Sequence, residues 1–269
     1  MNTRLTKEDQ AIIKKARRNK CSGPIYSEDG LRLLRVLGNP EYLEVKDGVK
    51  AICDEACQGL DNLHDVVLPA SVIYLGTRAF ASCIKLFKIT IPGIEFIGTE
   101  SFAHCENLKE ISLPETLGKI WEGAFADCKA LEEINIPSHL KIIDKSAVRN
   151  SGLKSLNIEI SDGGKCLVYD KAFASCKHLE SVYLNKNVKI VERMAFADCT
   201  SLKTIEFEQP SLTCCAGEIN ATMLIGCTSL EKIIVPKNEY NHYPDFNIQG
   251  YESDQFETRD FNSLVTPKE

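Results

Sequence analysis

The chain lacks long apolar runs and an excess of basic residues. No stretch of its 269 residues approaches the roughly 18 uninterrupted apolar residues of a membrane span, which argues against membrane insertion. Residues 1–20 are charged throughout, so they predict no secretory signal and, as written, a cytoplasmic protein. A cell-surface or secreted location would need a signal ahead of Met1 in the gene. The net charge of -6 disfavours nucleic acid as a partner, because binding it requires a basic surface.

The sequence is also poor in signs of catalysis. Its five histidines are scattered, and no G-x-S-x-G, H-E-x-x-H, P-loop or dinucleotide fingerprint occurs. We therefore expect no enzyme activity, no catalytic residue and no cofactor. Aromatic residues make up 7% of the chain, and few fall on the surface assigned below. A glycan is therefore a less favoured ligand than a protein.

What the sequence does contain is an internal repeat of about 23 residues. Each unit opens with Leu-x-x-Ile-x-Leu-Pro, typical of a strand with one buried face, and ends with Ala-Phe-x-x-Cys. The aromatic position falls at Phe80, Phe102, Phe125, Phe173 and Phe196, and at Val148 and Leu224 in degenerate copies. So short a unit cannot bury its own apolar side chains, and neighbouring units must stack.

These repeats predict a leucine-rich-repeat solenoid of the β-rich α/β class, with about eight rungs. One long parallel β-sheet should form its concave face. Short helical turns and irregular segments should form the rest, with the Phe and Cys of each turn directed into the core.

The repeat pattern, L-x-x-I-x-L-P-x-x-L-x-x-I-x-x-x-A-F-x-x-C, resembles the BspA-like (bacterial surface antigen A-type) leucine-rich repeat family. The resemblance runs from about Glu41 to Pro236. It implies a solenoid that binds proteins, often at microbial cell surfaces and in adhesion. The shared motif is structural, so no functional residue carries over. Val148 and Ser151 depart from the motif, which indicates local irregularity only.

The ends of the array need caps, because terminal rungs expose core. Residues 1–40 predict an N-terminal cap: a helix that begins with a capping box at Thr6 and Asp9 and ends near Asn19, then a hairpin or strand. Residues 41–236 are the repeats. Residues 237–269 predict an irregular C-terminal cap or tail that contains Tyr240, Tyr243 and further aromatics. Those aromatics cover the last rung or, alternatively, form a ligand platform.

Six of the twelve cysteines recur at one point of the rung: Cys83, Cys105, Cys128, Cys176, Cys199 and Cys227. Stacked side chains point the same way, so their sulfurs neither converge on a metal nor approach disulfide distance. We interpret them as buried thiols and expect no metal site. Reduced thiols fit a reducing compartment or an anaerobic habitat. Cys214–Cys215, in a larger insertion, is the candidate for an oxidisable pair.

The repeat frame also identifies strand residues that point away from the core. One column alternates in charge along Lys109, Glu132, Lys154, Glu180, Lys203 and Glu231, which predicts cross-strand pairs that hold the register. Small polar residues lie beside it. Our candidate ligand-binding residues on the concave face are Phe87, Glu110, Glu133, Ser155, Asn157, Ser181 and Tyr183. The expected partner is a protein or peptide of polar or modestly basic character.

Two functions remain open. The leading hypothesis is a non-enzymatic protein-binding module, with adhesion or host interaction implied by the family resemblance alone. The alternative is an intracellular structural or assembly scaffold, which the missing signal and the many thiols favour. A signal peptide upstream in the gene would favour the first.

Overall fold

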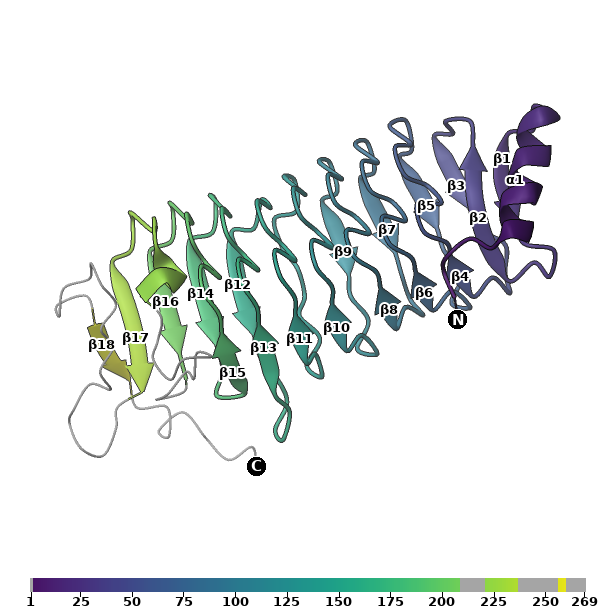
Figure 1. Ribbon diagram of the computed structural model, residues 1–269. Coiled ribbons are helices and arrows are strands. Elements are labelled where there is room, and N and C mark those ends of the chain that lie inside the picture. The colour runs from purple at the N-terminus through teal and green to yellow at the C-terminus, as the bar shows by residue number, and fades with distance from the viewer. Residues whose placement is uncertain (1, 209–220, 237–255, 260–269) are drawn as a thin grey trace.

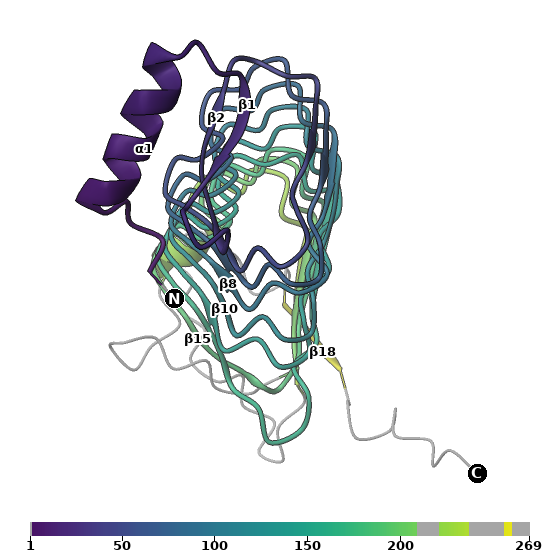
Figure 2. The same ribbon diagram turned by 90° about the vertical axis from the view of Figure 1, so that its right-hand side faces the viewer.

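The chain winds into stacked rungs along one axis, as the repeats predict (Figure 1). The computed structural model describes residues 2–208, 221–236 and 256–259. Viewed along the axis, successive rungs superimpose as one closed outline, with the N-terminal helix outside it (Figure 2). Each rung therefore shares its interior with its neighbours, which confirms the solenoid.

The front wall of the solenoid is built from the Leu-x-x-Ile-x-Leu segments. Its first sheet has four strands: β3 (Tyr42–Glu44), β5 (Asp65–Val67), β7 (Lys88–Thr90) and β9 (Glu110–Ser112). Its second sheet has five: β12 (Ser155–Ile158), β14 (Ser181–Leu184), β16 (Thr204–Phe207), β17 (Lys232–Pro236) and β18 (Phe256–Arg259). All pairs within both sheets are parallel. The front wall thus differs from the expected single sheet by one interruption.

The back wall is a continuous nine-stranded sheet. Its strands, in spatial order, are β1 (Gly23–Tyr26), β2 (Arg32–Leu37), β4 (Ala51–Ile52), β6 (Tyr74–Leu75), β8 (Phe96–Ile97), β10 (Lys119–Ile120), β11 (Ile142–Ile143), β13 (Cys166–Val168) and β15 (Val188–Val191). Strands β1 and β2 form an antiparallel hairpin, and the remaining pairs are parallel.

The third side of each rung is the Ala-Phe-x-x-Cys turn, which is tighter than the helical turn we expected. The Cys83 N–H closes a turn on the Phe80 carbonyl at 3.3 Å, but the Phe80 and Ser82 N–H groups donate to the next rung. Arg78 and Ser82 adopt positive φ on either side of Phe80, and the pattern repeats in later rungs. A helix cannot form because alternate amides are committed between rungs. Among the described residues, only η1 (Ala221–Leu224) is a 3-10 turn.

The core is a spine of stacked phenylalanines and thiols. Phe102 stacks on Phe80 and on Phe125 at ring-centroid distances of 5.6 and 5.4 Å. All six repeat cysteines are free and buried. Each thiol donates to a backbone carbonyl of the preceding rung; for example, Cys105 Sγ lies 3.1 Å from the Phe80 oxygen. Burial raises the pKa of Cys83 to about 12. These observations confirm the buried-thiol interpretation.

Helix α1 (Lys7–Arg18) packs on the outer side of β1 and β2 at the N-terminal end of the array (Figure 2). The capping box forms as predicted: Thr6 Oγ1 accepts from the Asp9 N–H, and Asp9 Oδ2 accepts from the Thr6 N–H. Ile13 packs with Leu34 and Cys53 in a separate small core. Arg32 donates two hydrogen bonds, of 2.8 and 2.9 Å, to the Asp9 carboxylate. The helix is therefore fixed by both apolar and ionic contacts.

Two expectations concern residues that the structure does not describe. Cys214–Cys215 lies outside the described residues, and so does most of the expected C-terminal cap, 237–269, including Tyr240 and Tyr243. Of that cap, the structure gives only the backbone of β18.

Candidate functional site

The front wall is interrupted at residues 131–137, which match the repeat frame but form no strand. Among the described residues, the backbone groups of residues 133–136 make no backbone hydrogen bond. Instead, the Asn135 side-chain amide pairs with Leu113, accepting from its N–H and donating to its carbonyl at 2.8 Å each. Ile134 and Ile136 are only partly buried. One asparagine side chain therefore takes the place of a strand pair.

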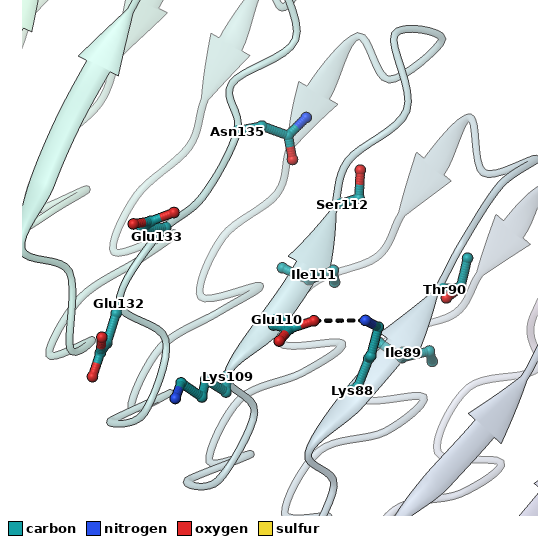
Figure 3. Close-up of a pocket in the computed structure, with 10 residues that line it drawn as sticks. All are labelled: Lys88, Ile89, Thr90, Lys109, Glu110, Ile111, Ser112, Glu132, Glu133 and Asn135. Atoms are coloured by element: carbon teal, nitrogen blue, oxygen red, sulfur yellow. Dashed lines mark hydrogen bonds and ion pairs between the residues drawn. The ribbon is translucent and has the colours of Figure 1, made fainter.

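A cavity of about 530 Å³ opens on the front face beside this interruption, and we call it the hollow (Figure 3). It is lined by Lys88, Ile89, Thr90, Lys109, Glu110, Ile111, Ser112, Glu132, Glu133 and Asn135. Its lining comes from β7, β9 and the segment 131–137, so it exists only because these rungs stack. The side chains in it are mostly charged or polar.

Most charges around the hollow are paired. Lys88 Nζ lies 2.6 Å from Glu110 Oε2, the contact drawn in Figure 3, and this hydrogen bond lowers the pKa of Glu110. Glu132 pairs with Lys154 at 2.7 Å, and that contact lowers the pKa of Glu132. Glu133 is exposed and makes no ion pair with any described residue. Lys109, also exposed in the hollow, likewise makes no ion pair with a described residue, so the hollow holds one carboxylate and one ammonium group available to a ligand.

The seven candidate residues fall into two groups, one around the hollow and one on the two strands that follow it. Glu110 and Glu133 line the hollow, and Phe87 directly precedes β7. The other four lie on β12 and β14, where Ser155 pairs with Ser181 and Asn157 with Tyr183. The two groups are adjacent, because Lys154, directly before β12, donates its N–H to the Glu132 carbonyl and pairs with the Glu132 carboxylate.

The second group surrounds Tyr183, whose phenol lies in an acidic environment. Partial burial, together with the nearby carboxylates of Glu208, Glu159 and Glu206, raises the pKa of Tyr183 to about 12. Asn157 donates to Glu159 Oε1 at 2.7 Å. Tyr183 therefore stays protonated at neutral pH and presents a hydroxyl among negative charges.

The candidate residues chosen from the sequence leave out two exposed apolar residues of the front face. Tyr42 is 52% exposed and Val67 is 47% exposed, and with Phe87 at 42% they are among the few exposed large apolar side chains. Tyr42 lies on β3 opposite Asp65 of β5, and Val67 lies on β5 opposite Thr90 of β7, three residues beyond Phe87. We call these three residues the apolar patch. Continuing the repeat frame one rung earlier, through Tyr42-Leu43-Glu44-Val45, would have found Tyr42.

The alternating charge column forms two of its expected pairs, Lys154–Glu132 and Lys203–Glu180, at 2.7 and 3.0 Å. Within the described part of the chain, no group of His, Cys, Asp and Glu side chains is arranged to hold a metal ion. No helix in those same residues is both long and apolar enough to cross a bilayer.

Comparison with known proteins identifies the family. The sequence profile of the BspA-type leucine-rich repeat region matches residues 41–163 and 166–257, in six copies. The chain belongs to the BspA-type leucine-rich repeat family. No curated protein matches this BspA-type chain.

Solved leucine-rich repeat proteins resemble the chain at low identity. A Treponema pallidum leucine-rich repeat protein is 24% identical, with a TM-score of 0.47, covering 78% of this chain and 88% of its own. A leucine-rich cell surface protein of Faecalibacterium prausnitzii is 22% identical, with a TM-score of 0.45, covering 75% and 61%. The pneumococcal vaccine antigen PcpA is 17% identical, with a TM-score of 0.38, covering 87% and 44%. The BspA-type chain thus spans less than two thirds of the last two proteins.

Proposed function

We propose that this chain is a non-catalytic module that binds a protein or peptide on its front face. The observation that carries the proposal is the hollow beside residues 131–137, where Glu133 lies exposed without a described basic partner. Leucine-rich-repeat arrays create extended surfaces for binding, and membership of the BspA-type family supports such a use.

The hollow is lined by three carboxylates and two lysines, and this small negative excess favours a modestly basic partner. A lysine or arginine side chain can form a charge-assisted hydrogen bond with Glu133, which the paired Glu110 and Glu132 are less free to do. The carboxylates around Tyr183 extend the same sign along the wall. Nucleic acid would be repelled, and a glycan would find few aromatic surfaces on which to stack.

The bound partner would serve adhesion or host contact in the more specific version of this proposal. The alternative is that the chain is an intracellular assembly scaffold. Both would use the same front face. They differ in whether the native gene encodes a secretory signal ahead of this sequence. Mapping the native start codon separates them.

The proposal is tested by affinity capture with the full chain, the Glu133→Gln variant and a Phe87→Ala/Asn157→Ala/Tyr183→Ala variant. Glu95→Gln is the matched control, because Glu95 is exposed on the back wall and loses the same charge. We expect Glu95→Gln to recover the native partners and both front-face variants to lose them. Equal recovery by all four proteins would refute a front-face site.

A further inference from the structure

The apolar patch and the hollow lie in one line along the front face. The strands follow one another in the order β3, β5, β7 and β9, and residues 131–137 come next. Tyr42, Val67 and Phe87 occupy the first three rungs of this line, and Glu133 occupies the fifth. A ligand laid along the solenoid axis would therefore meet apolar side chains first and a carboxylate last.

The spacing of the two features sets the length of such a ligand. The same rungs are paired on the back wall, β10 with β11 included, where neighbouring strands lie about 4.8 Å apart; at this rise per rung, Glu133 is about 14 to 19 Å from the middle and far end of the apolar patch. An extended peptide advances about 3.3 Å per residue and covers this distance in four to six residues. An α-helix rises about 1.5 Å per residue and would need about nine to thirteen.

The chemistry at each end is complementary to different side chains. Tyr42 and Val67 are about half exposed, so an apolar partner side chain would remove them from water. Glu133 instead requires a cation. β5 and β7 are hydrogen-bonded on both sides, so a peptide lying over these two strands crosses them and does not pair with them.

We propose that this front face binds an extended linear peptide with an aromatic or aliphatic residue four to six positions from a lysine or arginine. The apolar residue lies over Tyr42, Val67 and Phe87, and the cationic residue enters the hollow at Glu133. This inference rests on the proposed function and specifies the class of partner.

The test is selection of random sixteen-residue peptides, displayed on phage, against the full chain. We expect the enriched sequences to contain an apolar and a basic residue four to six positions apart. For a synthetic copy of an enriched peptide, we expect Tyr42→Ala and Glu133→Gln each to weaken binding about tenfold, measured by fluorescence polarisation. Added salt should weaken binding to the native chain more than to Glu133→Gln.

Matched controls fix the interpretation. Ile225→Ala removes a similarly exposed apolar side chain from another part of the array, and Glu95→Gln removes a back-wall charge; neither should change binding. All four residues are exposed, so all four variants should fold.

The possible results separate the two proposals. Enriched peptides that need Glu133 but carry no apolar residue at this spacing would overturn the proposed peptide motif. The proposed function would still stand. A spacing of nine to thirteen would replace the extended peptide with a helix. No enrichment would exclude linear peptides while leaving folded protein partners to the capture experiment. Enriched peptides indifferent to both substitutions would overturn both proposals.

Discussion

The front and back walls behave differently at the same rung. On the back wall, Lys119 and Ile120 of β10 pair with Ile142 and Ile143 of β11 without a shift in register. On the front wall, residues 131–137 of that rung leave the sheet. The core stays closed at this rung, where the fully buried Val148 stands between Phe125 and Phe173 of the neighbouring rungs. A solenoid rung held by its core and one wall can therefore release the other wall.

The loss of strand pairing at residues 131–137 is tolerated because this segment is not deeply buried. Its backbone groups can hydrogen-bond to water, which would be impossible in the interior. The Asn135 amide satisfies the Leu113 N–H and carbonyl that a strand would otherwise have paired. The interruption thus leaves a hollow on the surface without opening the core.

The largest expected effect comes from breaking the spine that both walls share. Phe125→Ala would remove a fully buried ring and lower the free energy of unfolding by about 3–5 kcal/mol. Phe87→Ala, at an exposed front-face position, should change it by no more than about 0.5 kcal/mol. Urea denaturation of both variants measures the difference. If both variants lost the same free energy of unfolding, the buried phenylalanines would not dominate the stability of the array.

The back wall also depends on α1, which packs over its first strands. Burial alone raises the pKa of Asp9, but hydrogen bonds from Thr6 and Arg32 outweigh it, so the pKa is lowered overall. Because the Asp9 pKa is lower in the folded than in the unfolded chain, where it is about 3.9, the ionised carboxylate stabilises the fold at any pH above 3.9. This contribution is lost as the pH falls from about 3.9 through the pKa of the folded state.

We therefore expect Asp9→Asn to lower the free energy of unfolding at pH 7 by about 1.5–3 kcal/mol. The difference from the native chain should shrink between about pH 4 and pH 2. Denaturation at a series of pH values measures it, with the exposed Glu28→Gln as the control. A pH-independent difference would contradict the role of the Asp9 charge.

A smaller effect is expected from repairing the front wall. Asn135→Val removes the amide that occupies Leu113 and supplies a side chain that favours strands. Residues 133–136 should then pair with β9 and β12, with a stability change within about 1 kcal/mol. Amide hydrogen exchange at Ile134 and Ile136 should slow. Asn157→Val, on the already paired β12, is the control; unchanged exchange at Ile134 would show that Asn135 does not cause the interruption.

Repetition made the fold predictable from the sequence, and local geometry made the site less so. Phe80, Phe102 and Phe125 share one position, and each buried copy reinforces the assignment of the others. Residues 131–137 match that frame as well as any rung does. Asn135 and Asn157 occupy the same position in neighbouring rungs, yet Asn135 bonds to Leu113 and Asn157 to Glu159. Composition and period cannot distinguish these two outcomes.

The smallest expected effect comes from the exposed ion pair beside the hollow. Lys154→Ala frees Glu132, and because both side chains are exposed, the free energy of unfolding should stay nearly unchanged. It should instead strengthen binding of a basic peptide, since a second carboxylate then faces the hollow. Lys203→Ala, which frees Glu180 two rungs beyond Lys154, is the control. Fluorescence polarisation measures both; an equal gain in affinity would mean that net charge, and not the hollow, governs binding.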